Sequence, residues 1–252
     1  MAPATSPRRE PDDYFHRSRQ PLHILVFLAP LVVLYEIGAA LYLAGDAAAI
    51  AEDIRAHRLL ADFFTAFGVG GFYLPGIALV VVLLIWQILA RHPWRVRRST
   101  LGGMLLESIV WTFPLLVLAQ MIAAPAQTPA ETVSPPLAAL AQAPPGTLHD
   151  LPLAARATIA IGAGLYEELL FRLVAIAFLH LLLADALGVP GRWADALAIV
   201  GAAVAFALYH EDHANVVFYT VAGLYFGGLF IFRGFGVAVA VHAIYDLVAL
   251  LL

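Results

Sequence analysis

The sequence contains no cysteine and no lysine, and each absence narrows the chemistry that the chain can support. Without cysteine there is no disulfide framework, no thiolate metal site and no cysteine nucleophile. Without lysine, all 14 basic residues are arginine. This excludes a Schiff base, a Ser–Lys dyad and a Walker-type phosphate loop.

Charged residues of both signs are also scarce. Only 13% of the residues are charged and 62% are hydrophobic, whereas a soluble domain has roughly 25% charged residues. The chain cannot cover a water-facing surface with so little charge. The net charge is −4, so the chain also lacks the basic surface of a nucleic-acid binder. The composition therefore excludes a soluble enzyme, a disordered chain and a nucleic-acid-binding protein, and it predicts a membrane protein with several spans.

Long apolar runs predict an all-α, polytopic membrane helix bundle of about 6–8 helices, because about 20 apolar residues cross a bilayer as a helix. Seven runs are long enough to be considered: 22–44, 72–90, 101–124, 151–183, 194–210, 216–232 and 235–252. The fourth run is longer than one crossing needs, so we expect it to be tilted or partly interfacial. Only two residues separate the last two runs, which keeps six crossings open as an alternative to seven.

The polar segments predict how the chain is organised. Residues 1–21 are polar and contain several prolines, so we expect a disordered cytoplasmic tail. Residues 22–252 form a single transmembrane domain, with scaffold helices in 22–124 and the polar motifs in 151–252. Arginines gather in the N-terminal segment and in 91–98, and cytoplasmic loops carry such an excess, so the N-terminus is expected to be cytoplasmic.

Ionisable side chains inside apolar runs are costly, and each is a candidate functional residue. Glu167 and Glu168 are followed by Arg172 in the fourth run. Glu168 and Arg172 are four residues apart, so they share a helical face and can form a structural ion pair. Glu167 points about 100° away from that face and has no such partner. It is therefore the candidate general base.

Two further motifs follow in the last apolar runs. Phe206 and His210 are four residues apart near the end of one run, and His242 and Asp246 are four apart within the last. A carboxylate at this spacing can fix the orientation and the tautomer of the histidine. A His–Asp pair within about 20 apolar residues is hard to explain by packing alone, which favours a functional role.

Together these motifs read Glu-Glu-x-x-x-Arg, Phe-x-x-x-His and His-x-x-x-Asp, in that order, on separate helices. The pattern resembles the CPBP family of intramembrane proteases, the group of CAAX proteases and bacteriocin-processing proteins related to type II CAAX prenyl endopeptidases. The resemblance covers roughly residues 151–252. It implies hydrolysis of a peptide bond within the membrane, in a membrane-embedded or membrane-anchored protein or peptide.

The resemblance also implies a role for each residue. Glu167 is expected to activate a water that His210 helps to hold, while His242 and Asp246 stabilise the oxyanion. Glu168, Arg172 and Phe206 are expected to support the site.

No cofactor is favoured. Glu167, His210 and His242 could form a zinc site with an open water position, but no local motif has the ligand spacing of zinc proteins. We therefore favour a metal-free glutamate protease.

Two rival functions stay open at this stage. A non-enzymatic immunity or scaffold protein could keep the same fold, although it has no evident need for the intact Glu/His/His set. A proton-coupled transporter could use buried Glu, His and Asp as a relay, but such transporters often show paired halves that this chain lacks.

The expected location is a bacterial inner membrane. Glu36 and Glu107 are left without a role, each as a cavity-lining residue or a partner of an arginine, and His180 is expected to be interfacial.

Overall fold

The computed structural model describes residues 13–43, 59, 62, 65, 74–123, 151–210 and 215–251. In this part of the chain every element of regular structure is a helix, as the all-α prediction requires. In chain order the helices are α1 (Tyr14–Ser18), α2 (Pro21–Tyr42), α5 (Leu74–Ala90), α6 (Arg98–Ala123), α8 (Leu153–Glu168), η4 (Leu169–Ala175), α9 (Ile176–His180), η5 (Leu181–Ala186), α10 (Gly191–Tyr209), α11 (Val216–Arg233) and α12 (Phe235–Leu251).

Five of these helical stretches are long and apolar enough to cross a membrane. They are α2, α6, the continuous stretch Leu153–Ala186 from α8 to η5, α10 and α11. Helices α5 and α12 are equally apolar, but each has only 17 residues, which gives about 25 Å at 1.5 Å per residue. The chain is therefore a multi-pass membrane protein, and the count of seven crossings stays a prediction.

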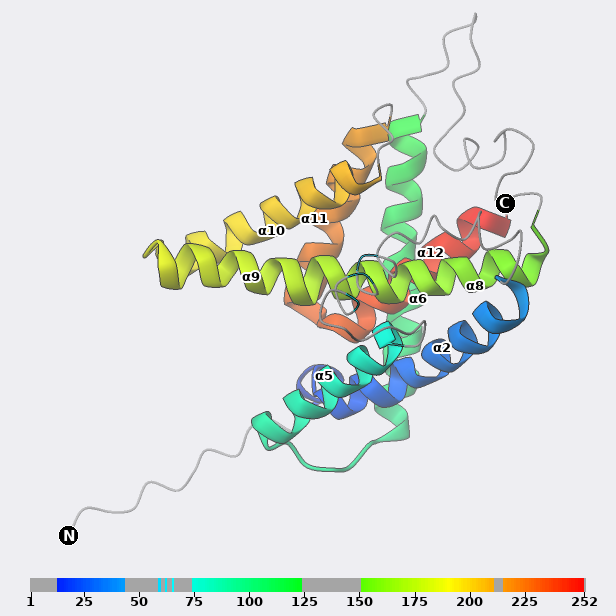
Figure 1. The fold of residues 1–252 in the computed structure, drawn as a ribbon, viewed down its shortest axis with the longest axis horizontal. Coiled ribbons are helices and arrows are strands. Elements are labelled where there is room, and N and C mark those ends of the chain that lie inside the picture. The colour runs from blue at the N-terminus through cyan, green and yellow to red at the C-terminus, as the bar shows by residue number, and fades with distance from the viewer. Residues whose placement is uncertain are drawn as a thin grey trace, which may run out of the picture.

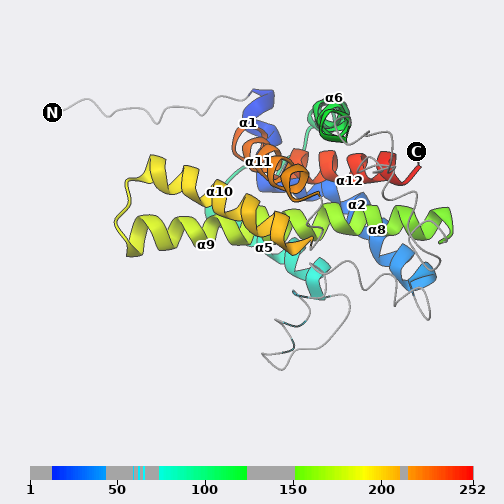
Figure 2. The same ribbon diagram turned by 90° about the horizontal axis from the view of Figure 1, so that it is seen from above.

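The long stretch from α8 to η5 runs across the molecule, with α10 on one side and α2 and α5 on the other, while α11 crosses it (Figure 1). Helix α8 packs against both α12 and α2, while α10 packs against α11 and α9. Helix α6 stands across the bundle and contacts α12 (Figure 2). The end of α8 is therefore in the middle of the bundle, where side chains from several helices can meet.

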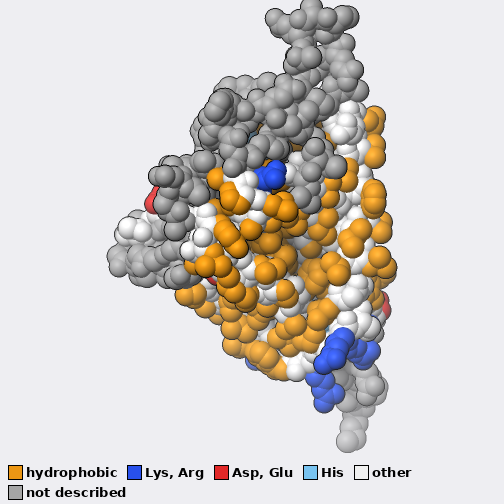
Figure 3. Space-filling view, turned by 90° about the vertical axis from the view of Figure 1, so that its right-hand side faces the viewer, with side chains coloured by type: hydrophobic (Ala, Val, Ile, Leu, Met, Phe, Trp, Pro, Cys, Tyr) orange, Lys and Arg blue, Asp and Glu red, His pale blue; other side chains and the backbone are white. Residues whose placement is uncertain are grey.

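Apolar side chains occupy both the interior and the outer surface of the bundle. One buried cluster joins α2, α5, α8 and α12, and a second joins α6, α10, α11 and α12. The outer surface is also hydrophobic, with Leu89 and Phe232 both 75% exposed. Figure 3 shows such a face, with basic side chains at its lower end. This distribution is that of a bundle surrounded by lipid.

The segment before the first long helix differs from the predicted disordered tail. Residues 14–18 form helix α1, which packs against α6. The Asp13 side chain caps α1 by accepting a hydrogen bond from the His16 backbone N–H at 2.7 Å, and Ser18 and Gln20 are buried. The prediction of disorder is therefore wrong for residues 14–21, because local capping and contacts with α6 order them. Residues 1–12 lie outside the described part of the chain.

Candidate active site

The helix that carries the first motif changes its hydrogen-bonding pattern at the motif itself. Helix α8 ends at Glu168, and the π-helical segment η4 begins at Leu169 and contains Arg172. Such turns are rare and occur frequently at functional sites. The first motif therefore lies on both sides of a break in regular helix geometry.

A close approach of α8 and α12 brings the first and third motifs together. Gly164 leaves room for the backbone of α12, since a Cβ at this position would lie 2.8 Å from the backbone nitrogen of Ala243. Glu168 lies one helical turn beyond Gly164, and His242 directly precedes Ala243. The absence of a side chain at Gly164 thus lets the two motifs meet inside the bundle.

Glu168 connects Arg172 to His242. Its Oε2 forms an ion pair with Arg172 Nε at 3.1 Å, as the four-residue spacing predicts. Its Oε1 accepts a hydrogen bond from His242 Nδ1 at 2.9 Å. All three residues are buried. The bond to His242 was not predicted, because it joins residues 74 apart in the sequence and no local spacing reveals it.

Glu167 faces both histidines of the motifs. Its Oε2 is 3.8 Å from His210 Nε2 and 3.8 Å from His242 Nε2. Both distances are too long for direct hydrogen bonds and are of the kind that a water can bridge. The same oxygen is buried and accepts no hydrogen bond from any described residue. Glu167 is therefore a buried carboxylate whose Oε2 faces two imidazoles without a direct hydrogen bond to either.

The second motif fixes the orientation of His210. Its Nδ1 is 2.8 Å from the carbonyl oxygen of Phe206, which can only accept, so Nδ1 carries the proton of this bond. The ring of His210 stacks on Tyr219, with centroids 4.0 Å apart. This arrangement turns Nε2, the atom that can accept a hydrogen bond in the neutral ring, toward Glu167.

Asp246 contacts His242, but it is not the carboxylate that holds the ring most directly. Its Oδ2 is 3.4 Å from His242 Nε2, whereas Glu168 lies at 2.9 Å from Nδ1. The Asp246 side chain is also 24% exposed, while that of His242 is 5% exposed. The predicted His–Asp contact is present. The shorter contact shows that Glu168 fixes the ring and Asp246 lies at its more open side.

Aromatic side chains enclose the buried charges. The Arg172 guanidinium lies over the ring of Phe206, 4.9 Å from its centroid, and Phe226 stacks on His242 at 4.6 Å. Sequence reasoning included Phe206 but missed Phe226 and Tyr219 on α11. These two aromatic residues are seven apart, two helical turns, and so share one face of α11. This seven-residue spacing is the sequence pattern that could have indicated an aromatic face on α11.

The geometry does not form a metal site in the described part of the chain. No group of three or more His, Asp or Glu side chains there is arranged to hold a metal ion. In particular, His242 has Glu168 at one ring nitrogen and Asp246 near the other. A zinc ion bound by Glu167, His210 and His242 would need these contacts to rearrange.

The three residues without an assigned role each have a partner outside the motifs. Glu107 pairs with Arg233, which is one of the two possibilities expected for it. Glu36 accepts a hydrogen bond from the hydroxyl of Tyr166 at 3.3 Å. His180 Nδ1 is 2.8 Å from a carboxylate oxygen of Asp195, and its interfacial position stays a prediction.

The fold and the site define a multi-pass membrane protein with a buried Glu–His–Arg cluster built from the C-terminal helices. Residues 149–248 match the family model of type II CAAX prenyl endopeptidase Rce1-like proteins. This confirms the resemblance to CPBP proteases, and the matched segment contains every residue of the three motifs. The matched family is a protease family, which supports a protease activity in general terms. Comparisons with curated proteins and with solved structures find no match.

Proposed function

We propose that this protein is an intramembrane endopeptidase that hydrolyses a peptide bond with a glutamate-activated water. The observation that carries the proposal is the position of Glu167, whose buried carboxylate lies 3.8 Å from the Nε2 atoms of His210 and His242. Glu167 lies on α8, His242 on α12, and His210 directly follows the last residue of α10. A buried carboxylate between two oriented imidazoles, with an oxygen that accepts no hydrogen bond from any described residue, is costly in a membrane and suits general-base chemistry.

The attack of water follows from the atoms on the Glu167 side. A water between Glu167 and His210 donates one hydrogen to each, because His210 presents an accepting Nε2. Glu167 takes a proton as the water oxygen bonds to the carbonyl carbon of the substrate. The proton then passes to the leaving amine as the C–N bond breaks, which restores the carboxylate. Water must reach the site through the protein, since the bilayer core holds none.

The oxyanion develops on the side of His242. Glu168 accepts from His242 Nδ1 and Arg172 balances the charge of Glu168. In its protonated form His242 presents an Nε2–H, with Asp246 beside it, to an oxygen that becomes negative in the transition state. Glu168 and Arg172 are positioning residues in this scheme, since they act through His242.

We propose that this chemistry needs no metal, and a metal titration tests that choice. The purified protein should contain less than stoichiometric zinc and should keep its cleavage activity in a chelator. Stoichiometric zinc, with activity lost to chelation and restored by zinc, would overturn the metal-free proposal while leaving Glu167 and both histidines at the site.

The proposed substrate is a membrane-embedded or membrane-anchored protein or peptide in a bacterial inner membrane. Arg17 and Arg19 lie just before α2. Arg91, Arg95 and Arg97 lie between α5 and α6, and Arg98 is the first residue of α6. The excess of arginine on the cytoplasmic side of membrane proteins supports an N-terminus in the cytoplasm.

A comparison of cell proteins identifies the substrate and tests the function. Membrane and secreted proteins from cells that carry the natural chain are compared with those from cells that carry Glu167→Gln. We expect one or a few uncleaved precursors in the variant only. Identical protein ends in both strains would favour the scaffold or transporter function. A variant at His180, which lies outside the motif cluster, is the control for a general effect of mutation.

A further inference from the structure

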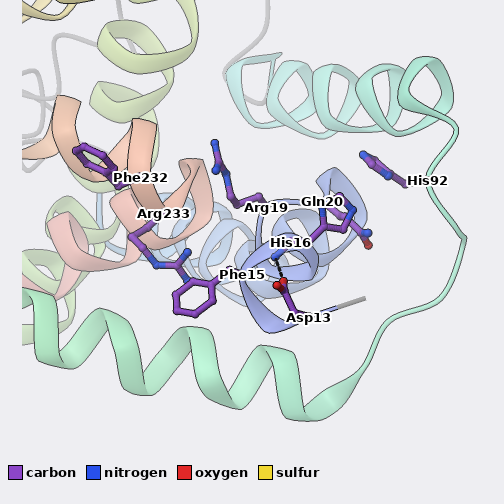
Figure 4. A pocket seen from close by; sticks show the side chains of 8 residues that line it. All are labelled: Asp13, Phe15, His16, Arg19, Gln20, His92, Phe232 and Arg233. Atoms are coloured by element: carbon purple, nitrogen blue, oxygen red, sulfur yellow. Dashed lines mark hydrogen bonds between the residues drawn. The ribbon is translucent and has the colours of Figure 1, made fainter. Parts of the chain in front are cut away.

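A second candidate site is a cavity of about 350 Å³ at the end of the bundle where α1 and α2 begin and α11 ends. Figure 4 shows how its side chains approach from these helices and from the segment after α5. The lining residues are Asp13, Phe15, His16, Arg19, Gln20, His92, Phe232 and Arg233. None of them belongs to the three motifs, so the cavity is separate from the candidate active site.

The two arginines in the cavity, Arg19 and Arg233, differ in their partners. The Arg233 guanidinium is bound by the carboxylate of Glu107, and one oxygen of Asp13 accepts the His16 backbone N–H. Arg19 donates from Nη2 to the carbonyl oxygen of Ile231 at 3.1 Å. No carboxylate of the described residues forms an ion pair with Arg19. Among the described residues, no acidic side chain therefore neutralises the charge of the Arg19 guanidinium in the cavity.

Further hydrogen-bond donors surround Arg19. The imidazoles of His16 and His92 both line the cavity, with centroids 5.7 Å apart in an edge-to-face arrangement. The backbone at His92 is held in place, because its carbonyl oxygen accepts from the Gln87 side chain at 2.8 Å. Gln20 adds an amide. A guanidinium with several N–H donors around it is suited to a group rich in acceptor oxygens, such as a phosphate.

The cavity also lies at the edge of the membrane-spanning helices. Both α2 and α11 are long enough to cross the membrane, and the cavity is at the first residues of one and the last residues of the other. Phe15 is 60% exposed and Phe232 is 75% exposed. Aromatic rings exposed at the end of a span contact the boundary between acyl chains and headgroups. A ligand with a charged head and an apolar body matches both halves of this cavity.

We propose that this cavity binds the headgroup of an anionic phospholipid. Arg19 contacts the phosphate, His16 and His92 donate hydrogen bonds to it, and Phe15 and Phe232 contact the acyl chains. Basic pockets between membrane helices bind anionic headgroups by the same interactions. The proposal stands independently of the protease activity, since it uses no motif residue.

A lipid titration of the full chain in detergent tests this proposal. The thermal unfolding midpoint is measured as phosphatidylglycerol, phosphatidylcholine or inorganic phosphate is added. We expect phosphatidylglycerol alone to raise it. Arg19→Gln should weaken the apparent affinity for phosphatidylglycerol about tenfold, because a charge-assisted hydrogen bond is lost. Arg95→Gln, an exposed arginine outside the cavity, is the matched control and should bind as the natural chain does.

The remaining outcomes overturn the proposal. Equal weakening by both arginine variants would show a general attraction to the basic segment. Equal effects of the two lipids would show that charge is not recognised, and protection by inorganic phosphate alone would assign the cavity to a soluble phosphate. If Arg19→Gln does not fold, His92→Ala on the opposite wall serves in its place. Binding of phosphatidylglycerol by His92→Ala with unchanged affinity would then contradict the proposal.

Discussion

The protein contains two polar clusters that differ in how their carboxylates are paired. In the motif cluster (Glu167, Glu168, Arg172, His210, His242), Glu167 keeps a buried oxygen without a hydrogen bond from any described residue. In the end cluster (Tyr14, Ser18, Glu107, Trp111, Arg233), Glu107 accepts hydrogen bonds from Tyr14, Trp111 and Arg233. A carboxylate whose two oxygens both accept hydrogen bonds from side chains stabilises a structure. A carboxylate with an oxygen that accepts none can still bind water and take up a proton.

The end cluster also explains why the N-terminal segment is ordered. Arg233 lies over the ring of Phe15, with its guanidinium carbon 4.4 Å from the centroid, and donates to Ser18 at 3.3 Å. These contacts connect α1 to the last residue of α11. Gly234 follows with a φ of 89°, a conformation that glycine adopts without strain, and α12 begins directly after it. The end cluster therefore supports the turn that leads to His242 from outside the candidate site.

The largest expected effect comes from removing the charge of Glu167. Glu167→Gln should lower the cleavage rate by about 100-fold to 10,000-fold, the range of general acid–base catalysis. The thermal unfolding midpoint should not fall, because the variant loses a buried charge whose Oε2 accepts no hydrogen bond from any described residue. Cleavage is followed with the precursor that accumulates in vivo. Near-normal cleavage by this variant would contradict the general-base role.

Within the motif cluster, Arg172 should matter first for stability. Arg172→Met replaces the guanidinium with an apolar side chain and leaves Glu168 buried without its arginine, at a cost of about 3–5 kcal/mol. Denaturant unfolding in detergent measures this cost. The double variant Glu168→Gln/Arg172→Met removes both charges and should recover part of the stability but not the activity, since His242 loses its carboxylate. A stable but inactive Arg172→Met would instead place Arg172 in the chemistry.

Glu107→Gln makes the matched substitution in the end cluster and should have the opposite effects. It weakens the ion pair with the buried Arg233. We expect a loss of about 2 kcal/mol in stability, less than for a fully buried pair, because the Glu107 side chain is partly exposed. Cleavage per folded molecule should be unchanged. A folded Glu107→Gln variant without activity would show that the two clusters are not separate in function.

The smallest effect is expected at Tyr14. Burial and the hydrogen bond to Glu107 raise the pKa of Tyr14 to about 12. Its contribution to stability is therefore complete below pH 10 and is lost as the pH rises through about 12. Tyr14→Phe should lose about 1 kcal/mol at neutral pH.

Thermal unfolding measured across the alkaline range tests this pH dependence. The difference between the natural chain and Tyr14→Phe should shrink with rising pH. A constant difference would contradict the assigned hydrogen bond.

The helices were predictable from the sequence because lipid imposes a simple rule on composition. Each of the seven apolar runs overlaps a helix in the described part of the chain, and the ion pair of Glu168 with Arg172 follows from spacing on one helix. What spacing could not provide is contact between helices. The bond from His242 to Glu168 and the ring of Phe226 on His242 depend on how α8, α11 and α12 pack.

The N-terminal segment was mispredicted for a related reason. Its polar composition and prolines indicate disorder when the segment is considered alone. The partners that order Tyr14 and Ser18 are Glu107 and Arg233, which follow far later in the sequence. A polar segment next to a membrane bundle can thus be ordered by buried charges that no local pattern reveals.

The close approach at Gly164 has a consequence for how inactive variants are interpreted. The close approach of α8 and α12 depends on the absence of a side chain at Gly164, which is not one of the motif residues. A substitution at Gly164 could leave every motif residue intact and still move Glu168 away from His242. Loss of function in this protein can therefore arise from added volume at a position where no chemistry occurs.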